Sequence, residues 1–174
     1  MKKTLDQLET KVLNWLKPLP HLPTNVTKWI AENAWWIAII GVFASVIGCI
    51  VVIMAIITAF AFFGLSVGIS HYYYASSVYT GWSLFILIVS LAFMLLMTVF
   101  IAKAISSLKK MQKTGWEALF TLQVITAIYI VISAVLSFDF MELLSGAVGV
   151  FIGAYFLFEI RSYFVKLAQK NTAK

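Results

Sequence analysis

Few side chains in this sequence are of the types that perform catalysis or bind metals. The chain has two histidines and one cysteine. His71 lies in a tyrosine-rich polar segment, and Asp139 and Glu142 lie in a short acidic segment further along. On one membrane face these three would supply the ligands that zinc prefers, but nothing in their spacing brings them together. Two scattered histidines also do not supply the paired axial ligands of a membrane haem. We therefore expect no catalytic residue, no metal and no cofactor.

The polar residues inside the long apolar segments are uncharged Ser, Thr and Gln. No Asp, Glu, Lys, Arg or His lies near the middle of a segment. Proton-coupled transporters need an ionisable group inside the membrane, so this pattern argues against one. Gln123 is the most polar deep residue. It either bonds to a neighbouring helix or lines a polar path with Ser45 and Thr98.

Charged residues lie at the ends of the apolar segments. Glu159 and Arg161 end the last segment, and Lys103 follows the second. We expect Glu159 either to pair with Lys103 or to extend to the membrane interface, because an isolated charge in hydrocarbon is costly.

Composition places most of this chain in lipid. Of its 174 residues, 62% are hydrophobic and 11% are charged, whereas soluble domains have roughly 25% charged residues. The net charge is +6. The basic residues flank the apolar segments, so we expect the partner to be the lipid bilayer, with anionic lipids on the cytoplasmic side, and not nucleic acid.

The apolar runs predict an all-α polytopic membrane protein with four transmembrane helices and an N-terminal amphipathic interfacial helix. The spans are expected at about 35–62, 82–102, 116–137 and 143–160. The first run exceeds the ~20 residues that cross a bilayer, so an irregular continuation after 62 and a loop over 70–80 are expected. Residues 1–23 form a cytoplasmic amphipathic helix and Pro-rich linker, 24–164 the transmembrane domain, and 165–174 a cytoplasmic basic tail.

Residues 4–17 predict the amphipathic helix, with one apolar face made of Leu5, Leu8, Val12, Trp15 and Leu16. Glu9 lies at the edge of this face. Thr4 with Gln7 has the spacing of a capping box, and Thr24 or Asn25 is expected to cap the next helix. The amphipathic helix either lies in the membrane interface or packs on a cytoplasmic loop of the protein itself.

Lysine distribution predicts the topology. Segments 64–80 and 137–142 contain no Lys or Arg, whereas 103–115 contains Lys103, Lys109, Lys110 and Lys113, and both termini carry lysines. The positive-inside rule then gives a multi-pass protein of the plasma (inner) membrane with both termini in the cytoplasm.

Small residues recur at helical spacing in the first and last spans and predict close helix packing. They are Gly41, Ser45, Gly48, Gly146, Gly149 and Gly153. The contact is either within the bundle or between copies in a homo-oligomer.

The dipeptides Gly81-Trp82 and Gly115-Trp116, each preceded by Thr, begin two spans. They are either interface-anchored helix starts or traces of an inverted repeat.

The last third of the chain resembles small multi-span membrane proteins of bacteria to which no activity is assigned. The resemblance lies in 115–120, in Gly149 and in 153–164. It implies a bacterial membrane protein and carries over no functional residue.

These observations favour a non-enzymatic integral membrane accessory, scaffold or regulatory protein that acts through helix packing with a membrane partner. The alternative is a small oligomeric transporter or channel with a pore at subunit boundaries. A membrane enzyme with a site on the outer face is the third interpretation.

Overall fold

The computed structural model is an assembly of α-helices that bears out the predicted fold class. It describes the backbone of residues 2–69 and 74–172, and the side chains of residues 5, 7–61 and 81–165. Within these ranges there are five helices and no strand: α1 (Lys2–Leu16), α2 (Thr24–Ile69), α3 (Tyr74–Lys109), α4 (Lys113–Ser137) and α5 (Phe140–Thr172). Four helices, α2 to α5, are long and apolar enough to cross a membrane.

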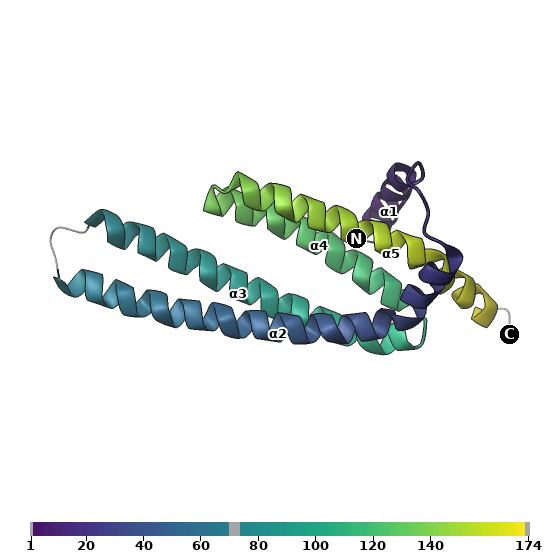
Figure 1. Cartoon of the computed structure of the whole chain (residues 1–174), viewed down its shortest axis with the longest axis horizontal. Coiled ribbons are helices and arrows are strands. Elements are labelled where there is room, and N and C mark those ends of the chain that lie inside the picture. The colour runs from purple at the N-terminus through teal and green to yellow at the C-terminus, as the bar shows by residue number, and fades with distance from the viewer. Residues whose placement is uncertain (1, 70–73, 173–174) are drawn as a thin grey trace.

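The four long helices form two antiparallel hairpins, α2–α3 and α4–α5, which lie side by side (Figure 1). Helix α3 packs along α4, while α2 contacts α5 less extensively. The α3–α4 turn, the start of α2 and the end of α5 lie at one end of the bundle, here called the basal end. At the opposite, distal end the α2–α3 hairpin extends beyond the α4–α5 hairpin.

The first hairpin is more helical than predicted. The expected irregular continuation after 62 is wrong, because α2 runs unbroken to Ile69. The expected loop over 70–80 is wrong for 74–80, which belong to α3. A helix satisfies all its backbone hydrogen bonds within one segment, which favours its continuation through apolar sequence without proline. Residues 70–73, and with them His71 of the zinc hypothesis, lie outside the described residues.

Both predicted N-terminal caps are also wrong. Thr4 lies within α1, which begins at Lys2. Thr24 and Asn25 lie within α2, where the carbonyl of Pro23 accepts from the backbone N–H groups of Val26 at 2.9 Å and Thr27 at 3.0 Å. Proline ends the preceding extended linker and still offers this carbonyl, so the helix begins at the proline boundary.

The α3–α4 and α4–α5 turns each contain a residue in the left-handed backbone conformation, and the second turn also contains a carboxylate that caps the next helix. Met111 (φ 50°) and Phe138 (φ 54°) close α3 and α4. Oδ1 of Asp139 then accepts from the backbone N–H groups of Met141 at 2.8 Å and Glu142 at 3.3 Å. Asp139 therefore caps α5, a role consistent with an acidic residue at a helix N-terminus.

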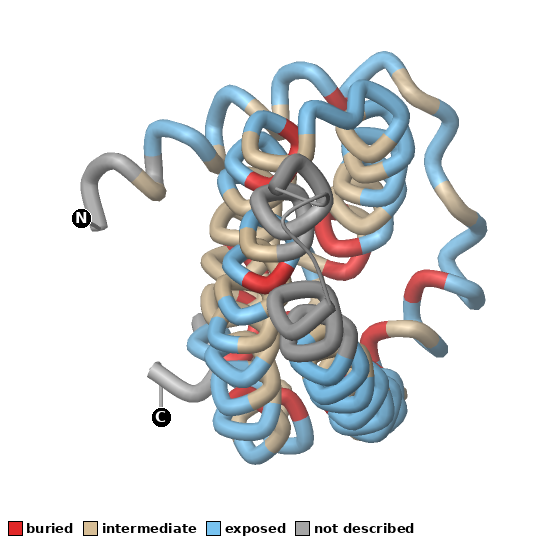
Figure 2. The backbone as a smooth tube through the Cα atoms, turned by 90° about the vertical axis from the view of Figure 1, so that its left-hand side faces the viewer, coloured by how far each residue is buried: buried red, intermediate tan, exposed pale blue. Residues whose placement is uncertain are grey.

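The buried core gathers towards the basal end. Figure 2 shows buried residues on the inward faces of the helices and exposed residues outside. The core consists of Leu16, Ala31, Ala34, Ala38, Ala104, Leu108, Trp116, Phe120, Leu157, Phe158, Ile160 and Phe164. Small residues come from α2 and aromatic residues from α4 and α5, so large and small side chains interlock.

Trp116 is the centre of this core. Its side chain is 0% exposed, stacks on Phe120 with ring centroids 5.5 Å apart, and meets Phe158 edge to face at 5.5 Å. Its indole N–H donates to the carbonyl oxygen of Leu157 at 2.8 Å. The prediction that this tryptophan anchors at the lipid headgroups is therefore wrong, because the aromatic cluster and a carbonyl partner hold it inside.

The other copy of the motif makes a related contact. The indole N–H of Trp82, at the beginning of the second span, donates to the carbonyl oxygen of Leu136 on α4 at 3.0 Å. Each motif tryptophan thus bonds to the helix that follows its own. Only Trp82 keeps substantial exposure, as an interface residue would.

The two motif glycines provide a stability test. A Cβ on Gly115 would lie 2.8 Å from the backbone nitrogen of Leu108, whereas a Cβ on Gly81 meets nothing within 4 Å. We expect Gly115→Ala to lower the free energy of unfolding by about 1–3 kcal/mol, as overpacking does. Gly81→Ala should leave it unchanged or raise it, since alanine favours helix. Thermal unfolding in detergent measures both, and equal midpoints for the two variants would contradict the close approach.

Candidate functional site

Helix α1 lies across the α4–α5 hairpin near its basal half (Figures 1 and 2). Leu5, Val12, Leu13 and Leu16 pack against the core. Trp15 is 77% exposed and borders an apolar groove against α4 and α5. The packing surface is therefore the α4–α5 hairpin, and it includes Lys113 and Thr114 at the beginning of α4, which face Leu5 and Glu9. The exposed Trp15 retains the property that suits an interfacial helix.

Glu9 and Arg161 join α1 to the end of α5. Nε of Arg161 donates to Oε1 of Glu9 at 2.6 Å, and a terminal guanidinium nitrogen reaches the same oxygen. The Glu9 side chain is 13% exposed and that of Arg161 30%. The guanidinium also lies 5.6 Å from the ring centre of Trp116. Glu9 thus faces Arg161 from the edge of the apolar face of α1. The attraction between the two charges offsets the cost of burying each of them.

A second set of contacts holds the linker that follows α1 and the first residue of α2. The hydroxyl of Tyr155 donates to the carbonyl oxygen of Pro20 at 2.5 Å, and that of Tyr163 donates to the carbonyl oxygen of Thr24 at 3.2 Å. Between them, Nδ1 of His21 lies 2.7 Å from Oε1 of Glu159. Tyr155, Glu159 and Tyr163 are spaced four residues apart and therefore form one stripe along α5.

These contacts revise the sequence prediction for Glu159. Its partner is His21, and not Lys103, which is exposed and has no ion pair among the residues that the structure describes. A linker carrying three prolines is stiff, so it holds His21 against α5. We call residues 2–23 the arm, and the Glu9–Arg161 pair with the Tyr155–Pro20 and His21–Glu159 contacts the arm clamp.

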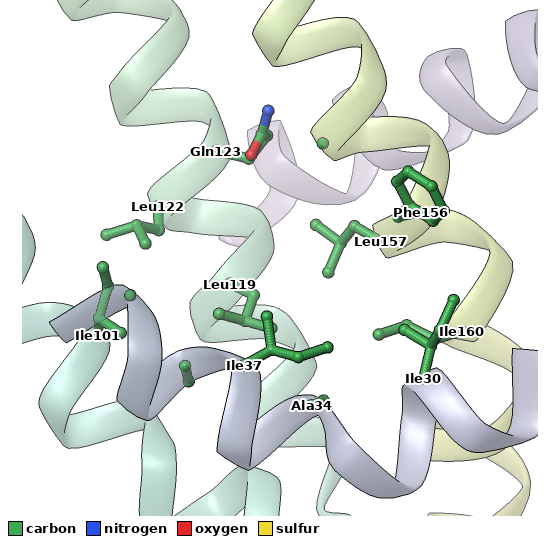
Figure 3. Close-up of a pocket in the computed structure, with 13 residues that line it drawn as sticks. Ile30, Ala34, Ile37, Ile101, Leu119, Leu122, Gln123, Phe156, Leu157 and Ile160 are labelled. Atoms are coloured by element: carbon green, nitrogen blue, oxygen red, sulfur yellow. The ribbon is translucent and has the colours of Figure 1, made fainter. Parts of the chain in front are cut away.

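An apolar groove of about 490 Å³ lies between the two hairpins. Its walls come from all four long helices: Ile30, Ala34, Ile37, Ala38 and Gly41 from α2, Ile101 from α3, Leu119, Leu122 and Gln123 from α4, and Gly153, Phe156, Leu157 and Ile160 from α5. Figure 3 shows these side chains around an open space, with Ile30 and Ile160 together at one end and Gln123 at the other. Gln123 is the one polar residue in this lining.

The three polar residues of the predicted path bond across neighbouring helices. Nε2 of Gln123 donates to the carbonyl oxygen of Val150 at 2.8 Å. The hydroxyls of Ser45 and Thr98 bond to each other across α2 and α3. The proposed path through Ser45, Thr98 and Gln123 is therefore divided between two helix pairs, α2–α3 and α4–α5.

The predicted small residues separate into two groups. Gly48, Gly146 and Gly153 each lie against a side chain of a neighbouring helix, namely Met94, Ile130 and Gln123. A Cβ on Gly41 or Gly149 would meet nothing within 4 Å, so neither takes part in close packing within the bundle. Gly41 instead lines the groove, and Gly149 is exposed.

No group of three potential metal ligands occurs among the side chains that were located. Glu142 accepts hydrogen bonds from the hydroxyls of Ser133 at 2.6 Å and Ser137 at 2.8 Å, which gives it a structural role at the distal turn. Comparisons of the chain with protein-family models, curated proteins and solved structures found no match.

The Glu9–Arg161 pair should control docking of the arm. Glu9→Gln removes a charged hydrogen bond worth about 1.5–3 kcal/mol. We expect roughly tenfold more undocked arm, since about 1.4 kcal/mol corresponds to a factor of ten. Limited trypsin digestion after the exposed Lys11 measures the undocked fraction.

The control uses an exposed pair. Lys28 and Glu32 form an i,i+4 pair with an Nζ–Oε1 distance of 3.8 Å and both side chains well exposed, and such pairs contribute little. Glu32→Gln should leave the cleavage rate unchanged. Combining Glu9→Arg with Arg161→Glu should restore protection of the Lys11–Val12 bond, and mass spectrometry of the fragments separates this bond from the new cleavage site after position 9. Equal cleavage of wild type and Glu9→Gln would show that the pair does not hold the arm.

Proposed function

We propose that this chain is a non-enzymatic integral membrane accessory or scaffold protein that acts through helix packing with a membrane partner. One observation carries the proposal: the distal half of α2 packs on α3 and leaves a continuous apolar face exposed. Ile47, Val51, Met54 and Ile57 are each more than half exposed. On the α3 side, Gly48 and Ser45 meet Met94 and Thr98.

The length of this hairpin supports the same proposal. Helix α2 has 46 residues, more than twice the ~20 needed to cross the hydrocarbon, and it extends beyond the α4–α5 hairpin (Figure 1). A helix of this length offers a partner span a long apolar surface for van der Waals contact, which drives helix association in lipid. The paired polar residues described above weigh against a pore through one subunit.

We further propose that the basal end faces the cytoplasm of a bacterial cell, with the protein in the plasma (inner) membrane. Lys109, Lys110 and Lys113 surround the basal α3–α4 turn, whereas the distal turn at Phe138–Asp139 carries no basic residue. Trp29 and Trp36 near the basal end of α2 are exposed, as headgroup-level tryptophans are. Basic residues there would attract anionic lipids.

Labelling of single cysteines tests this orientation. Gln112 is exposed at the basal turn and Phe138 is 89% exposed at the distal turn. With Cys49 replaced by Ala, Phe138→Cys should react with a membrane-impermeant maleimide added outside intact cells, and Gln112→Cys only after the cells are opened. Labelling of both from the same side would refute the orientation.

Site-specific photo-crosslinking tests the partner surface. A benzophenone amino acid replacing Val51 or Met54 should yield a discrete protein adduct in native membranes, because these side chains occupy the proposed contact face. The control position is Val135, which is exposed on α4 and should yield no such adduct.

Two further results decide the interpretation. Met54→Lys places a charge on the face and should abolish the adduct formed from position 51, since a charge in lipid costs about 2.5–3.5 kcal/mol. An adduct that is equally strong from Val135, or the absence of any protein adduct from α2, would contradict the proposed function.

A further inference from the structure

We propose that the groove between the hairpins binds one acyl chain of a membrane phospholipid from the leaflet at the basal end. The chain would lie between α2 and α5 and become part of the packed interior. This site is separate from the exposed distal face of α2, so the lipid site and the partner surface can be tested independently.

The chemistry of the walls selects an apolar occupant. Twelve of the thirteen lining residues are Ile, Leu, Ala, Gly or Phe. The single polar residue, Gln123, already donates to the carbonyl oxygen of Val150. An apolar cavity of this kind stays dry, because water finds too few hydrogen-bond partners in it. An empty groove would also forfeit dispersion contacts along its whole lining.

The size of the groove suits a slender apolar ligand. The groove has a volume of about 490 Å³. Binding cavities for small molecules have volumes of about 300–1,000 Å³. A single hydrocarbon chain is the occupant that the bilayer itself supplies in this size range.

The mouth of the groove opens to lipid. Ile37 on α2 and Phe156 on α5 line the groove and are 49% and 42% exposed. Towards the basal end, Ile30 and Ile160 come together (Figure 3). The exposed Trp29 lies one residue before Ile30 and marks the headgroup level. A chain anchored at that level reaches the groove from the basal leaflet and ends near Gln123.

Gly41 provides a variant that fills the groove without disturbing the fold. It lines the groove, and a Cβ placed on it meets no atom within 4 Å. Gly41→Leu therefore directs its side chain into the space proposed for the lipid chain. Gly149→Leu is the matched control, because this glycine is equally open but does not line the groove.

The experiment uses the full-length chain in nanodiscs of phosphatidylethanolamine and phosphatidylglycerol, doped with phosphatidylcholine that carries a diazirine in the middle of one chain. After illumination, mass spectrometry locates the adducts. We expect labelling at groove residues such as Leu122 and Leu157 to exceed labelling at the exposed Ile132 and Val135. Gly41→Leu should lower groove labelling about tenfold, equivalent to about 1.4 kcal/mol, because its side chain occupies the space proposed for the lipid chain. Gly149→Leu should leave groove labelling unchanged, because Gly149 does not line the groove.

Uniform labelling of groove and exposed positions in the wild type would overturn the proposal, as would groove labelling that persists in a folded Gly41→Leu variant. Circular dichroism and thermal unfolding verify the fold of each variant. If Gly41→Leu melts early, Leu122→Trp fills the same space from α4 and must give the same loss. No partner protein is present in the nanodiscs, so failure here leaves the α2 crosslinking result untouched.

Discussion

The structure depends on one constraint: inside hydrocarbon, every polar group must find its partner within the protein. The backbone meets this constraint by forming long uninterrupted helices. Hydroxyls meet it locally, as when Thr58 donates to the carbonyl of Met54, or across helices, as when Tyr129 donates to Ser90 at 2.9 Å. The indole N–H of Trp116 meets it by bonding to Leu157. Each polar residue that satisfies the constraint between two helices also fixes how those helices sit.

The same constraint explains where the charges lie. Glu9 and Arg161 meet at the basal end, where the α1 helix crosses the α4–α5 hairpin, and each removes the penalty of burying the other. Glu159 is drawn to His21 of the linker for the same reason. The arm is therefore held by ionic and polar contacts at its edges, while its leucines pack on the core. A charged clamp around an apolar contact gives both attachment and defined position.

The spans and their order follow directly from the apolar runs, because length and composition alone decide whether a helix can cross a bilayer. The arm clamp could not be predicted from the sequence. Glu9 and Arg161 are 152 residues apart, and no periodicity links such distant positions. Glu9 at the edge of an apolar face was the one available signal that it had a partner. The predicted interface position of Trp116 was wrong for a related reason. Tryptophan occurs both at membrane interfaces and in protein cores, and only the neighbouring aromatic residues in space decide between the two environments.

The α2–α3 and α4–α5 hairpins contact each other unequally, and this inequality leaves two apolar surfaces, the groove and the distal face of α2. The α3–α4 turn is tight, with Gly115 against the backbone of Leu108. The α2–α5 contact is slight, and the groove lies beside it. Packing on α3 therefore mainly determines the position of α2. In the distal half of α2, the face opposite α3 is exposed. A chain lying in the groove would add contacts between α2 and α5 where the protein provides few. Lipid packing would then set the relation of the two hairpins, while the distal α2 face stays available to a protein.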